Sequence, residues 1–181
     1  MRKNAEVLLL LPCTNKKPYT EAPTWKYVMK NIGPWLNAVD LAAVDCITDP
    51  LTGLPFGIVT ESEQYLTIDK DEKPSPEKIP VLVEQIRNKL KLLSPHYNHI
   101  ISYINVKSYW KAVEAVQPEF DIKMLPKMYM NEKNWNSKIC RMGPIGMFKI
   151  AIDELRKEIM RATNPTRKEK RPLRKRWKKK G

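Results

Sequence analysis

The sequence contains no long hydrophobic run. Spanning a bilayer takes about 20 consecutive apolar residues, and no stretch of this chain approaches that length. Residues 1–4 are basic, but the apolar run after them is short and ends at Pro12-Cys13 without a small-residue cleavage site. This pattern predicts a strand rather than a signal peptide. We therefore expect no membrane partner.

Cysteine is also scarce. Cys13, Cys46 and Cys140 are far apart and odd in number. They form neither a disulfide framework nor a paired metal-ligand spacing, which favours a reducing, cytoplasmic setting and predicts no metal or cofactor. We interpret Cys46 and Cys140 as buried small hydrophobic residues rather than reactive thiols.

The chain has two histidines, His96 and His99, which flank the start of a predicted strand. Histidine in such a place can be a metal ligand or a general base. Here no cysteine or carboxylate pattern accompanies the pair, so we interpret both as surface groups.

Positive charge is abundant and unevenly distributed. The net charge is +13, and residues 161–181 hold eleven basic residues against one acidic residue. This segment therefore carries +10 and leaves +3 for residues 1–160. At 181 residues the chain has room for one domain and an appendage, which we place at 1–162 and 163–181.

The appendage has no apolar periodicity, so it cannot bury enough surface to fold alone. Arginine and lysine interleaved with one tryptophan are typical of an extended arm that binds nucleic acid. A membrane-binding tail would need more large apolar anchors than Leu173 and Trp177 supply. The predicted RNA-binding residues are Arg167, Lys168, Lys170, Arg171, Arg174, Lys175, Arg176, Trp177, Lys178, Lys179 and Lys180.

The remainder alternates short apolar runs with segments of helical periodicity. Strands are predicted at 6–11, 41–48, 56–60, 99–105 and 120–125, and helices at 23–36, 79–93, 106–117 and 147–162. Pro118 is expected to introduce the last strand. The alternation is typical of an α/β fold with three layers, in which helices cover both faces of a mainly parallel sheet. The run at 6–11 is expected to be the central strand.

A polar loop follows that central strand and carries a thiol, a hydroxyl, an amide, two amines and a phenol within residues 13–19. In open α/β sheets, ligands bind outside the carboxyl ends of the strands, so this loop is the candidate site. A polar strand-to-helix connection is the alternative interpretation, because most such loops are polar.

The stretch around this loop resembles a motif of archaeosine synthases, archaeal enzymes that modify a deazaguanine in tRNA. Their pattern is Pro-Cys, three residues, Lys-Pro-Tyr, two residues, Ser or Thr, two residues, His. Here Pro12-Cys13 and Lys17-Pro18-Tyr19 match, whereas Ala22 replaces the hydroxyl residue and Trp25 replaces the histidine. The resemblance implies a related fold, an RNA connection and, if the chain is an enzyme, Cys13, Lys17 and Tyr19 as catalytic residues.

A looser similarity to the same family covers residues 49–55 and the acidic stretch after them, so that the resemblance extends over about 6–117. The acids of this stretch, Glu61, Glu63, Asp69, Asp71 and Glu72, suit a cationic substrate amine, although a solvated loop is the commoner explanation. Farther along, residues 127–142 hold Tyr129 and Trp135, which can stack on bases or form a loop that covers the sheet. The glycines at 143 and 146 weakly suggest an anion site at a helix start.

Two functions are compatible with these features. The first is an RNA-binding structural protein, a component of an archaeal ribosome that binds ribosomal RNA and neighbouring ribosomal proteins. The second is an active tRNA-modifying enzyme that transfers lysine to a nitrile-bearing deazaguanine in tRNA. Ala22 and Trp25 favour the first, because residues of a catalytic unit act together and loss of one member can abolish activity.

Overall fold

The apolar run near the amino terminus forms β1 (Val7–Pro12), the middle strand of a five-stranded sheet with the order β3-β2-β1-β4-β5. It pairs in parallel with β2 (Val39–Thr48) on one side and with β4 (His99–Tyr103) on the other. Every residue of β1 is buried. A strand covered on both faces needs an apolar residue at each position, so the uninterrupted run correctly predicted a central strand.

The computed structural model describes residues 5–64, 73–136 and 148–164. Within them, β5 (Ile122–Leu125) continues the parallel sheet beyond β4. At the other edge, β3 (Pro55–Thr60) is antiparallel to β2, because a short loop joins the two strands. The sheet is therefore mainly parallel, as predicted, with one antiparallel edge strand.

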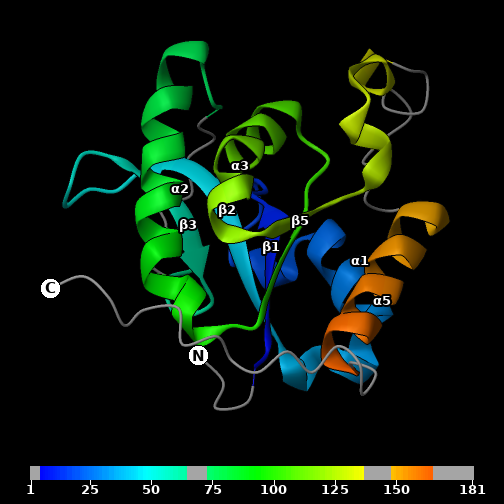
Figure 1. Ribbon diagram of the computed structural model, residues 1–181. Coiled ribbons are helices and arrows are strands. Elements are labelled where there is room, and N and C mark those ends of the chain that lie inside the picture. Colours follow the sequence, from blue (N-terminus) through cyan, green and yellow to red (C-terminus); the bar gives the residue numbers. More distant parts are fainter. Residues whose placement is uncertain (1–4, 65–72, 137–147, 165–181) are drawn as a thin grey trace, which may run out of the picture.

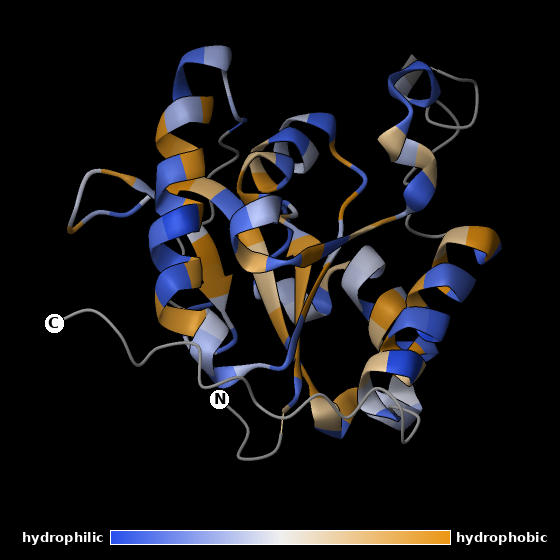
Figure 2. Cartoon of the chain, viewed as in Figure 1, coloured by the Kyte–Doolittle hydropathy of each residue, from blue (hydrophilic) through white to orange (hydrophobic). Residues whose placement is uncertain are grey.

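Helices cover both faces of the sheet (Figure 1). On one face lie α2 (Ile79–Leu93) and α3 (Lys107–Phe120), and on the other lie α1 (Pro23–Asn31) and α5 (Lys149–Thr163). Figure 2 shows strands that are mostly hydrophobic and helices that alternate hydrophobic with hydrophilic residues. This is the three-layer α/β fold that the sequence predicted.

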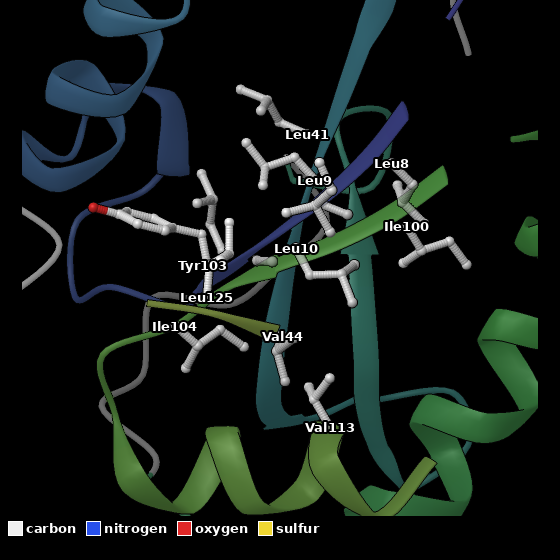
Figure 3. Close-up of a cluster of buried hydrophobic side chains, with 14 of the residues drawn as sticks. Leu8, Leu9, Leu10, Leu41, Val44, Ile100, Tyr103, Ile104, Val113 and Leu125 are labelled. Carbon is white, nitrogen blue, oxygen red and sulfur yellow. The ribbon is translucent and has the colours of Figure 1, made fainter. Parts of the chain in front are cut away.

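The core is built around the leucines of β1. Figure 3 shows Leu8, Leu9 and Leu10 in a cluster of buried side chains that also includes Val44 of β2 and Val113 of α3. Both valines are fully buried. Because alternate residues of a strand point to opposite faces, β1 contributes to the packing of both helical layers. No helix within the described residues is long and apolar enough to cross a membrane.

Several predicted helix and strand boundaries were wrong where they had been placed at a proline. Pro118 lies inside α3, which ends at Phe120, and β5 starts at Ile122. Near a helix end, proline removes one backbone hydrogen bond and leaves most of the helix intact. Asp121 then ends α3 in the left-handed conformation, with φ of 53°.

The predicted helix at 23–36 is two elements, because α1 ends at Asn31 and a 3-10 helix follows over Gly33–Ala38. Pro34 occupies its first turn, where a missing N–H costs nothing. In the same way, Pro76 starts a short 3-10 turn and Pro80 lies in the first turn of α2. The last helix is described from Lys149, and the glycines at 143 and 146 lie outside the described residues.

Candidate functional site

The site lies where the chain leaves the sheet in two directions. After β1 the chain continues to α1 on one face, and after β4 it continues to α3 on the other. Such a divergence between neighbouring parallel strands leaves a crevice at their carboxyl ends. A cavity of about 400 Å³ opens there, which we call the carboxyl-edge cavity. Its lining residues are Cys13, Thr14, Asn15, Lys17, Ile47, Lys73, Pro74, Val106, Ser108 and Tyr109.

The Cys13 thiol is held by a tyrosine of α3. Its Sγ lies 2.9 Å from the Tyr109 hydroxyl oxygen, and that oxygen lies 3.3 Å from Sγ of Cys46 on β2. Tyr109 is almost fully buried. The tyrosine hydroxyl therefore joins the start of α3 to the ends of the two central strands, which fixes one wall of the cavity.

Burial, reinforced by the nearby charge of Asp45, raises the pKa of Cys13 to about 12. The hydrogen bond with Tyr109 and the charge of Lys17 act in the opposite sense but do not offset burial. Burial also raises the pKa of Tyr109. Both groups are consequently protonated at neutral pH. Since the thiolate is the nucleophilic form of cysteine, this environment suits a structural thiol better than a catalytic one.

We expect alkylation of Cys13 by iodoacetamide to accelerate about tenfold per pH unit from pH 8 to pH 10, because the thiolate fraction of a raised-pKa thiol keeps growing over this range. A cysteine with an ordinary pKa of about 8.5 levels off near pH 9. Peptide mass spectrometry separates Cys13 from Cys46 and Cys140, and urea-unfolded protein is the control. A plateau near pH 9 in the folded protein would contradict the raised pKa.

Lys17 turns back on its own loop. Its Nζ donates a hydrogen bond to the Thr14 carbonyl oxygen and lies 4.2 Å from the centroid of the Tyr19 ring. The ammonium group is thus positioned by a backbone carbonyl and an aromatic face, both of which favour a fixed positive charge. Lys17 also lines the carboxyl-edge cavity, so the structure brings it together with Cys13 as the sequence motif suggested.

Tyr19 contacts the Lys17 ammonium group from within the core. It is fully buried, does not line the cavity and stacks on Trp25, with ring centroids 5.2 Å apart and planes 20° apart. Trp25 is also fully buried, and its Nε1 donates a hydrogen bond of 3.1 Å to the Pro12 carbonyl oxygen. Ala22 is buried as well. These residues therefore pack the loop against the end of β1.

The comparisons with known proteins give a fold and no function. No family model matches this chain, and no curated protein matches it. A solved structure that is similar is described as the crystal structure of AF0587, a protein of unknown function. The two share 18% sequence identity with a TM-score of 0.55, over 86% of this chain and 44% of that one. This chain thus spans less than half the length of its structural neighbour, and the likeness establishes the fold alone.

The candidate acidic residues are engaged elsewhere or lie outside the described residues. Neither Glu61 nor Glu63 lines the cavity. Burial opposes ionisation of Glu63, but hydrogen bonds from Lys89 and from the Thr60 hydroxyl and backbone N–H keep its pKa below the usual value. Asp69, Asp71 and Glu72 fall in a range that is not described. Glu63 therefore links β3 to α2.

The aromatic residues after β5 cover the core. Tyr129 is buried and stacks on Trp135 with centroids 3.7 Å apart, and both rings meet Trp110 of α3 edge-on. The Trp135 Nε1 donates to the Tyr129 carbonyl oxygen. Of the two interpretations of residues 127–142, packing over the sheet fits the described part, and residues 137–142 lie outside it.

Of the remaining residues singled out from the sequence, the two histidines are described in the structure, and Cys140 and the predicted RNA-binding residues are not. His96 and His99 are exposed, as surface groups should be. Among the described residues, no cluster of three or more His, Cys, Asp or Glu side chains could hold a metal ion. Cys140 and every predicted RNA-binding residue from Arg167 to Lys180 lie outside the described residues.

Two residues of the site were missed by sequence reasoning. Tyr109, which holds Cys13, follows β4 in the first turn of α3, and Lys73 enters the cavity from a stretch that carries no motif. For Tyr109 a signal existed. The residues that follow the strand beside the central one belong to the same crevice in this class of sheet.

Proposed function

We propose that this chain is an RNA-binding structural protein that attaches to RNA through its basic carboxyl-terminal segment, as a component of a ribosome. The observation that carries the proposal is the charge of residues 161–181, which hold +10 of the chain's +13. Dense cations meet many phosphates at once and release their counterions, which supplies strong binding without sequence readout.

The geometry of the motif loop supports a structural rather than a catalytic role. Tyr19 packs in the core against Trp25, and the Cys13 thiol is protonated and hydrogen-bonded to Tyr109. With these contacts, Tyr19 and Cys13 fix the shape of the loop over residues 13–19, which accounts for their presence without a catalytic role. Residues 1–160, which carry a net charge of only +3, are then the folded domain that the basic segment attaches to RNA.

We expect the protein to sediment with ribosomal subunits when an extract of the cells that make it is separated on a sucrose gradient. The association depends on charge, so raising the salt concentration should release the protein, as should digestion of the RNA. A tagged chain without residues 165–181 is the matched control and should stay near the top of the gradient. Finding the full chain there in low salt would contradict the proposal.

A second candidate function is lysine transfer to a nitrile-bearing deazaguanine in tRNA. The observation that favours it is the presence of Cys13 and Lys17 in one cavity. We expect no transfer, because Tyr19 is outside the cavity and the thiol is protonated. The measurement is incorporation of labelled lysine into tRNA that carries the modified base. Robust turnover by the wild-type chain that Lys17→Ala abolishes would reverse the order of the two functions.

A further inference from the structure

The charged residues that line the carboxyl-edge cavity are both lysines, Lys17 and Lys73. A second groove, of about 370 Å³ at the opposite end of the sheet, differs in this respect, because Asp121 and Glu158 line it together with basic residues. Among the described lining residues, the charged side chains are thus two amines. Ligands of negative charge are favoured there.

The other titratable groups of the lining do not cancel this charge. Cys13 and Tyr109 have raised pKa values and remain neutral, so neither adds a negative charge at neutral pH. Asp45 is fully buried and does not line the cavity, although its charge acts on Cys13 more strongly than the charge of Lys17 does. Its Oδ1 accepts a hydrogen bond from the Ile47 backbone N–H.

The rest of the lining combines an apolar wall with hydrogen-bonding groups. Pro74 and Val106 supply apolar surface, while Thr14 and Ser108 supply hydroxyl groups. The 14-residue helix α3 starts at this edge, and no side chain caps its first turn at Val106. The positive end of its dipole adds to the field of the lysines. A volume of about 400 Å³ falls within the range of small-molecule sites.

We infer that the carboxyl-edge cavity binds a nucleotide, with the phosphate at Lys17 and Lys73 and the base against Pro74 and Val106. The phosphate accounts for the two amines, and the base accounts for the apolar wall. The nucleotide belongs either to RNA or to a free nucleoside phosphate. If the nucleotide belongs to RNA, the inference rests on the proposed function and adds an RNA contact on the folded domain. If it is a free nucleoside phosphate, the inference is independent of that function.

The test is a titration of the ¹⁵N-labelled full-length chain with AMP, followed by amide chemical shifts, with adenosine and inorganic phosphate as separate probes. We expect AMP to shift the amides of Thr14, Asn15 and Ser108, and to bind at least tenfold more tightly than either fragment, because it uses both parts of the cavity. Absence of these shifts, or shifts that map to another surface, would overturn the inference.

Three variants distinguish AMP binding in the cavity from nonspecific attraction to the positive charge of the chain. Lys73→Ala should weaken AMP binding about tenfold, the scale of one charge-assisted contact. Lys91→Ala, which removes an exposed lysine from the last turn of α2, should change it less than twofold. Val106→Trp, which fills the cavity without altering charge, should abolish binding while the thermal midpoint stays within a few degrees. Equal affinities for all three variants would overturn the inference.

Competition identifies the source of the nucleotide. A short single-stranded RNA that displaces AMP from the full-length chain assigns the cavity to RNA, and an RNA that leaves AMP bound assigns it to a free nucleotide. Failure of the nucleotide inference and failure of the proposed RNA-binding function give different results. A chain that binds AMP in the cavity and has no affinity for RNA would refute the RNA-binding proposal and retain the nucleotide site.

Discussion

Removing residues 165–181 should reduce the salt dependence of RNA binding by roughly four to six units of log K against log salt. This follows if about six to eight cations of the segment contact phosphates, since each contact on a single strand contributes about 0.7 units. The segment contains ten of the chain's basic residues. The measurement is a salt titration of fluorescence anisotropy, with full-length and truncated chains on the same labelled RNA.

The truncated chain should still fold. α5 ends at Thr163, its last turn is closed by the bond from the Asn164 backbone N–H to the Met160 carbonyl oxygen, and its buried residues already pack on the sheet. Circular dichroism and the thermal midpoint test this directly. A chain in which residues 165–181 are replaced by a glycine-serine sequence of equal length separates charge from chain length.

Trp177→Ala in the full chain separates stacking from charge, because an indole stacked on a base contributes about 1–3 kcal/mol to binding and does not alter the salt slope. Equal salt slopes for the full-length and truncated chains would mean that the folded domain makes the phosphate contacts. The basic segment would then have no part in RNA affinity, and the proposed function would lose its main support.

The sheet was predictable because its central strands carry a simple signal. β1 and β2 are buried on both faces, so β1 is a continuous apolar run and β2 is mostly apolar, as expected for interior strands of a parallel sheet. Element ends were less predictable, because local residues do not determine them alone. Pro118 is compatible with a strand start and with the last turn of a helix, and α3 continues through it to Phe120.

The sequence predicted the side of the site that the loop after β1 forms, but not the side that α3 forms. The motif located Cys13 and Lys17, since a polar loop directly after a central strand must reach the carboxyl edge. The motif did not indicate that Tyr19 would lie outside the cavity lining, because a tyrosine can present its hydroxyl to a site or bury its ring, and the sequence does not distinguish the two. The place of Tyr109 after the strand beside the central one indicated the same crevice, but its hydrogen bond with Cys13 joins residues 96 positions apart and was not evident from the sequence.

Trp25→Ala should lower the free energy of unfolding by about 3–5 kcal/mol, the usual cost of removing a fully buried aromatic side chain. The variant loses the stack on Tyr19 and leaves the Pro12 carbonyl oxygen without the indole N–H. Urea unfolding followed by circular dichroism measures the change. Leu51→Ala is the surface control, since Leu51 is 94% exposed, and should alter stability by less than about 0.5 kcal/mol.

Tyr19→Phe gives the sharper comparison between a catalytic and a packing role for the motif. The Tyr19 hydroxyl is buried and has no hydrogen-bond partner among the described residues. A buried hydroxyl without a partner costs about 1–3 kcal/mol, so phenylalanine should leave stability unchanged or raise it by up to about 1 kcal/mol. RNA affinity should also be unchanged. A packing role requires the ring at position 19 and not its oxygen, so a Tyr19→Phe variant that unfolds more readily or loses RNA affinity would show that the hydroxyl makes a necessary contact.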